Sequence, residues 1–216
     1  MFPDLLTDDA FRLETRRLWL RWPRVADAAV IAKLAGDKAV SQHTKGLPHP
    51  YPVPEAEKYV MTARKDNANG KQLTLVITRK GKPDAVGMIS AQPNTSGQAG
   101  LDFWIGKSFW GSGIMGEALD EVLALLFSAT TAKAVTAHVR EDDESARHLL
   151  ASRGFKQEEK LHVNMPLRGG IFPCGKFRLE QAGWQLRETE RFKRHGRAAA
   201  AAGQGTKTDD ACLAPC

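Results

Sequence analysis

The sequence predicts a single-domain α/β (α+β) fold, with a central mixed, mostly antiparallel β-sheet and helices on both of its faces. The chain has 216 residues, which is enough for one hydrophobic core and too few for two large ones. Hydrophobic residues make up 42% and charged residues 26%, so the chain as a whole is not disordered. Strand-like and helix-like segments alternate in the order β-α-α-β-β-β-α-β-α-β-β, and this order implies the mixed sheet.

The predicted strands are short runs rich in β-forming residues, separated by turn signals. In chain order they are 13–22, 72–78, 85–91, 101–105, 134–139, 155–165 and 177–179. The first is the best defined, because Leu18, Leu20 and Trp22 alternate onto one face.

The predicted helices carry apolar residues at helical spacing or begin at a recognisable start signal. In chain order they are 27–34, a helix that opens at Pro54, 113–129 and 143–152. Proline suits the first helical turn, and the glutamates that follow Pro54 favour the positive end of the helix dipole. The segment 41–52 holds three prolines and is expected to be a loop.

Three parts of the chain are distinguished by composition. Residues 1–12 are expected to be an N-terminal extension, and 13–186 the folded domain. Residues 187–216 are basic, then alanine-rich, then small and polar. Because such a segment cannot bury enough apolar surface to offset its ordering entropy, we expect a disordered tail whose start could be helical.

Charge and cysteine content narrow the possible partners and the compartment. The net charge of +6 suits an anionic ligand, but the basic residues are mostly interspersed, so nucleic acid is not an expected partner. No uncharged stretch reaches the ~20 residues that span a bilayer, and the first residues do not form a secretory signal, so no membrane partner is expected. No cysteine precedes Cys174 and no Cys/His cluster occurs, which predicts no metal site and a reducing cytoplasm.

A glycine-rich turn at 111–116, between a strand and a helix, is the segment that most favours ligand binding. Glycines let a ligand approach the backbone, and a helix N-terminus offers unpaired N–H donors to a phosphate. The GxxxxGK[ST] pattern of a P-loop does not occur. The turn matches GxGxxG literally, but it lies mid-chain and no acidic residue ends the next strand, so a dinucleotide site is not indicated. A turn without a ligand is the alternative.

The segment FWIGKSFWGSGIMGEAL resembles the acetyl-CoA loop of the GNAT acetyltransferases, in the branch of the Rim-type ribosomal-protein N-terminal acetyltransferases. In the family pattern Q/R-x-x-G-x-G/A, Trp110 stands at the Q/R position, Gly113 at the glycine and Met115 at the G/A position, where it departs from the pattern. Three further segments resemble the same branch in the same order: LETRRLWLRW, LPHPYPVPEAEKYV and REDDESARHLLASRGF. The resemblance covers about 13–186 and implies a GNAT-like fold.

The resemblance implies direct transfer of an acetyl group from acetyl-CoA to a primary amine, on a protein N-terminus or a small molecule. It also implies that the loop holds the diphosphate and that an exposed strand pairs with the pantetheine arm. The cofactor-binding residues so implied are Phe103, Trp104, Ile105, Trp110, Gly111, Ser112, Gly113, Ile114, Met115, Gly116 and Asp143. Asp143 and Ala146 stand where the branch has Asn and Ser, and Asp143 would add negative charge near the ligand.

The candidate catalytic residues are two carboxylates and a hydroxyl. A neutral amine is needed for attack, so a base must take its proton. Asp102 lies on the strand before the loop, and Glu158 stands where a related enzyme carries a base. Ser145 is the candidate donor to the departing thiolate. His138 is expected to be a packed core histidine.

The acceptor is expected to contact the proline-rich loop through His43, His49 and Tyr51. A non-catalytic acyl-CoA-binding module is an alternative function, because the changed residues at 143 and 146 could leave no working acid and base. A ribosome- or RNA-associated protein that uses the basic tail is another. The sequence leaves open which amine is the acceptor and whether the protein is a monomer or a homodimer.

Overall fold

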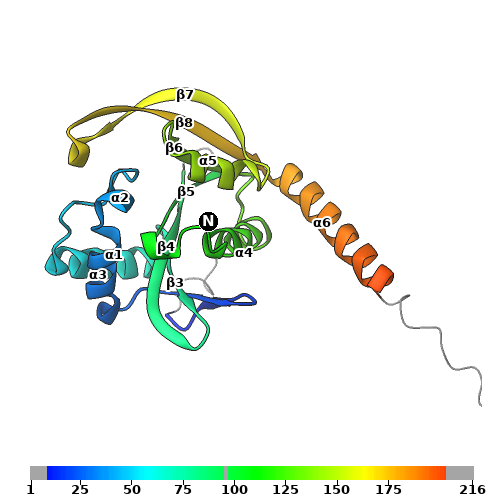
Figure 1. The fold of residues 1–216 in the computed structure, drawn as a ribbon, viewed down its shortest axis with the longest axis horizontal. Coiled ribbons are helices and arrows are strands. Elements are labelled where there is room, and N and C mark those ends of the chain that lie inside the picture. The colour runs from blue at the N-terminus through cyan, green and yellow to red at the C-terminus, as the bar shows by residue number, and fades with distance from the viewer. Residues whose placement is uncertain (1–8, 95–96, 203–216) are drawn as a thin grey trace, which may run out of the picture. The chain divides into compact units, whose positions relative to one another are not determined.

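A mixed β-sheet organises the larger part of the chain (Figure 1). The computed structural model describes residues 9–94 and 97–202, in two units that divide after Gln181. In the described part of the first unit the strand order is β1-β2-β3-β4-β5-β6-β8-β7, and every neighbouring pair is antiparallel except β5 with β6. The strands are β1 (Arg12–Glu14), β2 (Leu18–Arg21), β3 (Leu73–Arg79), β4 (Lys82–Pro93), β5 (Gln98–Ile105), β6 (Ala134–Arg140), β7 (Lys156–Met165) and β8 (Gly170–Glu180).

Helices cover both faces of the sheet, as the sequence predicts. Helices α1 to α3 lie on one side of the central strands, and α4 and α5 lie on the other (Figure 1). The helices of the first unit are α1 (Ala28–Ala35), α2 (Lys38–Ser41), α3 (Val53–Ala68), α4 (Ile114–Ala129) and α5 (Glu144–Ala151). The described residues also form the single-turn helices η2 (Val25–Asp27), η3 (Lys107–Phe109) and η4 (Pro166–Arg168). The predicted α/β fold class is confirmed.

The segment 13–22 is wrong as one strand, because the chain reverses direction at 15–17 and forms β1 and β2 instead. Thr15 makes the turn: its backbone N–H donates to the Leu18 carbonyl at 3.0 Å, and its Oγ1 accepts from the Leu18 N–H at 2.9 Å. The prediction that Leu18, Leu20 and Trp22 share one face is confirmed, because all three side chains are buried.

Two other elements differ from the expectation. Helix α2 was not predicted; the Asp37 side chain caps it by accepting from the Ala39 N–H at 2.8 Å. The predicted strand at 177–179 is only the end of β8, which starts at Gly170 and forms a long hairpin with β7. Its first half contains glycine and proline, which are uncommon within strands, so the sequence did not mark this part as a strand.

The parallel strands β5 and β6 part from each other halfway along their length. Their register runs from the pair Gln98 and Ala134 to the pair Leu101 and Ala137. Beyond that point β5 pairs only with β4 and β6 only with β8. The backbone of 102–105 therefore faces a gap in the sheet instead of a strand.

The described part of the second unit is formed by the helix α6 (Gln181–Ala202), whose first residue is the last of the first unit. The helix includes 187–202 of the segment expected to be a tail, while 203–216 and most of the expected extension at 1–12 are not described. The three-part division of the chain stays a prediction. No helix among the described residues is both long and apolar enough to cross a membrane.

Candidate functional site

The glycine-rich turn leads from the end of β5 into α4 and has the open geometry that the sequence suggests. Gly111 and Gly113 have φ values of 70° and 73°, in the left-handed region that favours glycine. A Cβ atom at Gly111 would meet no other atom within 4 Å, so the turn stands open to solvent. Gly113 is the N-cap of α4.

The first turn of α4 presents unpaired donors at this opening. Within the described chain, Glu117 is the first residue of α4 whose N–H has a backbone acceptor, the Gly113 carbonyl at 3.1 Å. The N–H groups of Ile114, Met115 and Gly116 precede it and are the donors that a helix start leaves unsatisfied. Such donors, with the positive end of the helix dipole, suit a phosphate or diphosphate.

Two arginines flank these donors. A Cβ at Gly116 would lie 2.2 Å from Nη2 of Arg153, so the absence of a side chain there lets the guanidinium lie against the helix. Arg153 also pairs with Asp120 at 3.2 Å. On the other side, Nη1 of Arg17 donates to the Ser112 carbonyl at 3.1 Å. The open turn, the free donors and two cations together fit the diphosphate of a nucleotide-bearing cofactor.

Glu117 ties the β1–β2 turn to the start of α4. Its Oε1 accepts from Thr15 Oγ1 at 2.6 Å and from the Arg17 N–H at 2.8 Å, and its Oε2 accepts from Arg17 Nε at 2.6 Å. Partial burial alone would raise the pKa of Glu117, but the hydrogen bonds from Thr15 and Arg17 outweigh that effect and lower it. This carboxylate holds the loop in place and is not a proton acceptor in the resting structure.

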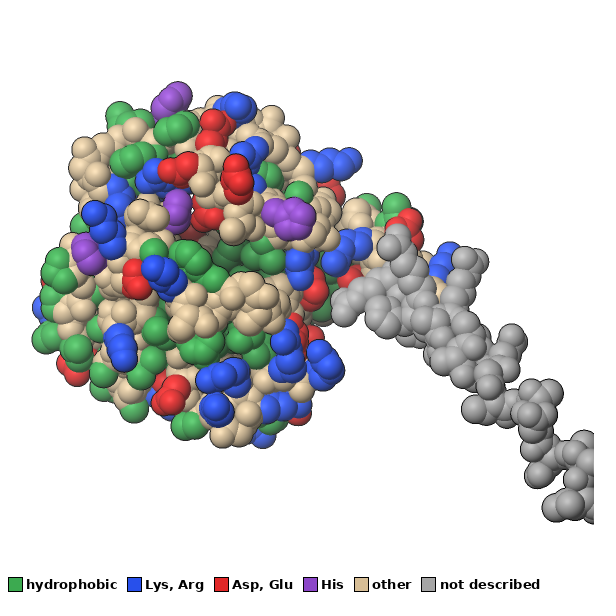
Figure 2. All heavy atoms as spheres, viewed as in Figure 1, with side chains coloured by type: hydrophobic (Ala, Val, Ile, Leu, Met, Phe, Trp, Pro, Cys, Tyr) green, Lys and Arg blue, Asp and Glu red, His purple; other side chains and the backbone are tan. Residues whose placement is uncertain are grey.

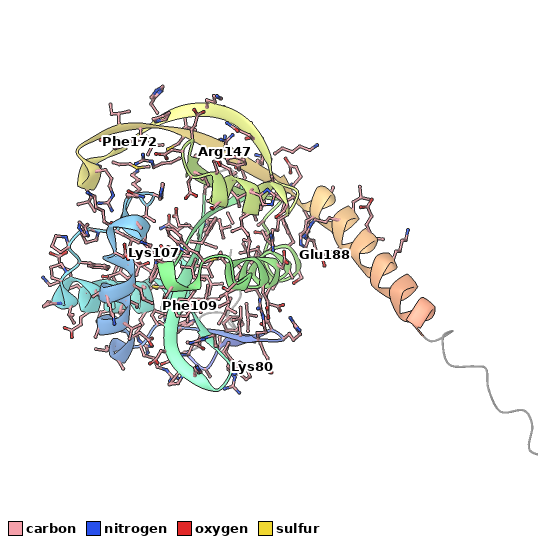
Figure 3. All side chains as sticks on the ribbon, in the orientation of Figure 1. Lys80, Lys107, Phe109, Arg147, Phe172 and Glu188 are labelled. Carbon is pink, nitrogen blue, oxygen red and sulfur yellow. The ribbon has the colours of Figure 1, made fainter. Side chains whose placement is uncertain are left out.

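The aromatic residues around the turn divide between core and surface. Trp104 packs against the cluster of buried side chains under α1 and α3. Trp110 is half-exposed, and its indole N–H donates to the Ile105 carbonyl at 3.0 Å. Phe109 lies on the turn that precedes α4 (Figure 3), and the guanidinium carbon of Arg79 lies 5.2 Å from the centre of its ring. Phe103 and Ile105 are half-buried on the strand beside the gap.

Figure 2 shows a hollow near the centre of this face, with hydrophobic side chains below it and acidic, basic and histidine side chains above it. Asp102 and His138 are the first residues on β5 and β6 after the strands part. Asp102 reaches solvent, but protein surrounds most of its carboxyl group, and this desolvation raises the pKa of the carboxyl. The charges of His138 and Lys45 act in the opposite direction. Burial above all, together with the charges of Tyr51 and Asp102, raises the pKa of Tyr59 on α3 to about 12, so Tyr59 stays protonated.

The loop on the acceptor side is tied to the far half of the sheet. Nη1 of Arg140 donates to the Gln42 carbonyl at 3.0 Å, and Nε of Arg168 donates to the Ser41 carbonyl at 2.8 Å. Arg168 also donates to the Leu47 carbonyl. Phe172 stacks on Arg140 at 4.2 Å, near the tip of the β7–β8 hairpin (Figure 3). The loop and the hairpin tip therefore form one wall above the gap.

The predicted acceptor residues lie in or beside this loop. His43 lies 3.7 Å from Asp142, which follows β6. His49 donates from Nδ1 to the Gly36 carbonyl at 2.6 Å, when that nitrogen carries the proton. Tyr51 is half-buried and packs against the same core cluster as Trp104. Desolvation, together with the nearby Glu55 carboxylate, raises the pKa of Tyr51 to about 12.

The other predicted polar residues lie on β7 and at the start of α5. Glu158 is on β7 and lies 3.4 Å from both Lys176 and Arg178. Asp143 caps α5 by accepting from the Ala146 N–H at 2.9 Å. Ser145 is exposed in the first turn of α5. The structure thus brings Asp102 and the glycine loop to the same gap, whereas two strands, β6 and β8, separate the strand of Asp102 from that of Glu158.

Sequence reasoning missed Tyr59, Arg17 and Arg153, and it misjudged His138. The expectation that His138 packs in the core is wrong, because the residue is exposed between buried Ala137 and Val139. That alternation was visible in the sequence as a polar residue between two apolar ones. The two arginines carried no local signal, since each is far in sequence from the loop that it flanks.

Residues 17–156 match the family model described as the acetyltransferase (GNAT) domain. The chain belongs to the GNAT acetyltransferase family. This GNAT protein is therefore an N-acetyltransferase, as its sequence suggested. No group of His, Cys, Asp and Glu residues that could hold a metal ion occurs in the described part of the chain.

Solved structures share the fold at low sequence identity. RimJ of Mycobacterium smegmatis, in complex with CoA-disulfide, is 23% identical with a TM-score of 0.67; the match covers 76% of this chain and 81% of RimJ. The ribosomal-protein-S5-alanine acetyltransferase of Vibrio fischeri is 16% identical with a TM-score of 0.70, covering 81% and 98%. The microcin C7 self-immunity acetyltransferase MccE, in complex with acetyl-CoA and AMP, is 18% identical with a TM-score of 0.68, covering 77% and 93%. No curated protein sequence matches this chain significantly.

Proposed function

We propose that this GNAT protein uses acetyl-CoA as the donor and transfers the acetyl group directly to a primary amine. The observation that carries the proposal is the continuity of the gap with the glycine loop. The open edge of β5 runs from Asp102 to the turn that presents the free N–H groups of α4. One elongated ligand could therefore lie with its diphosphate on the loop and its reactive end beside a carboxylate. The complexes of RimJ with CoA-disulfide and of MccE with acetyl-CoA support this choice of donor.

The loop and the open strand would bind and orient the donor. The N–H groups of Ile114, Met115 and Gly116 would hold diphosphate oxygens, with Arg17 and Arg153 beside them. The backbone groups of 103–105 would pair with the amide groups of the pantetheine arm as another strand does. When bound, acetyl-CoA supplies an acetyl group activated as a thioester.

Asp102 would take the proton of the acceptor amine at the other end of the gap. As the C–N bond forms and the C–S bond breaks, one proton leaves the nitrogen and the carboxylate becomes neutral. Desolvation raises the pKa of Asp102, and a more basic carboxylate is a better proton acceptor at neutral pH. Tyr59 of α3, which the high pKa keeps protonated, is a second hydroxyl donor to test. Ser145 as donor to the thiolate stays a prediction.

The acceptor would enter from the side of the loop 41–52 and the β7–β8 hairpin. The bonds from Arg140 and Arg168 fix this wall, and it carries His43, His49 and Tyr51. The name of the S5-alanine acetyltransferase, whose acceptor is a ribosomal protein, makes a protein amine such as an N-terminus the first acceptor to test, ahead of small-molecule amines. The cytoplasmic location expected from the sequence agrees with such an acceptor and is part of the proposal.

Release of free thiol from acetyl-CoA, with a panel of peptides that differ in their N-terminal residue and a panel of small amines, tests the proposal. We expect thiol release that depends on the amine, with mass spectrometry showing one acetyl group on its nitrogen. Asp102→Asn should lower kcat/KM by about 10²- to 10⁴-fold, the usual contribution of a general base. If acetyl-CoA binds but no amine in either panel is acetylated, the protein is better explained as a non-catalytic acyl-CoA-binding module.

A further inference from the structure

We propose that His138 is a positioning residue for acetyl transfer, which faces the Asp102 carboxylate across the gap and keeps it ready to accept the proton of the amine. The inference rests on the proposed function, because it assigns to His138 a role through the base of that reaction. His138 is separate from the glycine loop and was expected to be a core residue.

The backbone places the two side chains opposite each other. Leu101 and Ala137 are the last registered pair of β5 and β6, so Asp102 and His138 are the next residues on the two strands. Each is also fixed on its outer edge, Asp102 by its register with Ser90 of β4 and His138 by its register with Lys176 of β8. Their separation is therefore set by sheet geometry and not by a flexible loop.

Burial shows that both side chains are on the same face of the sheet. Leu101 and Ala137 are buried, whereas Asp102 and His138 are exposed. Because side chains alternate along a strand, Asp102 shares its face with Trp104, which packs against the cluster of α1 and α3. The pair therefore lies on the side of the sheet that α1 and α3 cover, where Tyr59 packs against the same cluster as Trp104.

The surrounding charges leave His138 as the main group that acts on this carboxylate. Desolvation raises the pKa of Asp102. The charge of His138 lowers this pKa more strongly than the charge of Lys45 does. Lys176, the neighbour of His138 on β8, lies 3.4 Å from Glu158, and Arg140 on the same strand pairs with Asp142 at 2.5 Å. These two cations are thus held by other carboxylates. His138, next to Asp102 across the point where the strands part, is therefore the group best placed to act on this carboxylate.

A carbon-detected NMR titration of the Asp102 carboxyl tests the inference without any acceptor. In His138→Gln the opposing charge is removed while a side chain that can form hydrogen bonds remains. The pKa of Asp102 should then be higher than in the wild type. His162→Gln, which changes an exposed strand histidine on β7, is the matched control and should leave that pKa unchanged. An Asp102 pKa that is the same in His138→Gln and the wild type overturns the proposal.

The pH dependence of kcat/KM gives the second test. In His138→Gln the acid limb of the profile should move to higher pH with the pKa of the base, and below that pKa each unit of the shift lowers the rate about tenfold. The activity should recover toward the wild-type value at alkaline pH, and acetyl-CoA affinity should not change. A uniform loss at all pH values indicates a structural role and overturns the inference. If the wild type acetylates no amine, the proposed function fails, and the NMR titration alone decides whether His138 acts on Asp102.

Discussion

Replacement of Glu117 with glutamine is expected to loosen the glycine loop and to destabilise the fold in a pH-dependent way. The carboxylate accepts hydrogen bonds from the Thr15 hydroxyl and from the backbone and side chain of Arg17. The glutamine side chain would keep one carbonyl acceptor but place an amide donor against Arg17. A hydrogen bond to a charged group contributes about 1.5–3 kcal/mol when buried, and the ion pair contributes less here because the Arg17 side chain is 41% exposed. We therefore expect a loss of about 1–2 kcal/mol at pH 7.

The sign of the pH dependence follows from the lowered pKa of Glu117. Its folded-state pKa lies below the unfolded value, so the carboxylate stabilises the fold above the unfolded pKa and loses that contribution as pH falls through the folded pKa. The stability difference between the wild type and Glu117→Gln should be complete at pH 7. It should shrink through the acid range and disappear once the wild-type carboxyl is protonated.

Urea denaturation at a series of pH values measures this difference directly, provided that the m-value is unchanged. Glu57→Gln, at an exposed position on α3, is the control and should show little effect at any pH. Acetyl-CoA affinity should also fall in Glu117→Gln, because Arg17 bonds to the Ser112 carbonyl within the loop. Equal stability of the variant and the wild type at pH 7, or a loss that persists undiminished at acid pH, would refute the reasoning.

Three other substitutions have distinct expected outcomes. Gly116→Ala places a Cβ 2.2 Å from Nη2 of Arg153, so that side chain must move, and calorimetry should show weaker acetyl-CoA binding with only a small change in Tm. Arg168→Ala frees the loop before α3, which should raise KM for the acceptor in steady-state kinetics while acetyl-CoA affinity stays the same. Asn67→Ala leaves the N–H and carbonyl of Thr74 without their buried partners, at 2.7 and 2.9 Å, and should cost about 2–3 kcal/mol in a denaturation experiment.

The parts of the site that a local pattern encodes could be predicted from the sequence. The strand, glycine turn and helix around Gly113 follow one another within a few residues, so spacing alone indicated them. The burial of Leu18 and Leu20 followed from strict alternation. In contrast, the division of 13–22 into two strands depends on the hydroxyl of Thr15, which accepts from the Leu18 N–H. A threonine can stand at the end of a strand or within it, so the sequence alone does not show the turn.

The gap itself could not be predicted, because it depends on register between strands that are far apart in the sequence. No residue close to His138 in the sequence indicates that β6 separates from β5 at that position. Asp143 was expected to contact the cofactor because of its place in the family pattern, and that stays a prediction. Its observed role as the cap of α5 is a local one that Asp at a helix start commonly fills.

Stabilisation of the protein by acetyl-CoA is the most direct test of the central claim, that the glycine loop and the open edge of β5 hold this donor. A ligand at 100 times its Kd should add about 2.7 kcal/mol to the stability of the wild type. Gly113→Glu, which adds bulk and negative charge at the start of α4, should abolish the gain. Gly169→Glu should retain it, because Gly169 has the same left-handed backbone, with a φ of 72°, on the η4 turn. No stabilisation of a well-folded wild type by millimolar acetyl-CoA, or an equal gain in Gly113→Glu, would contradict the account.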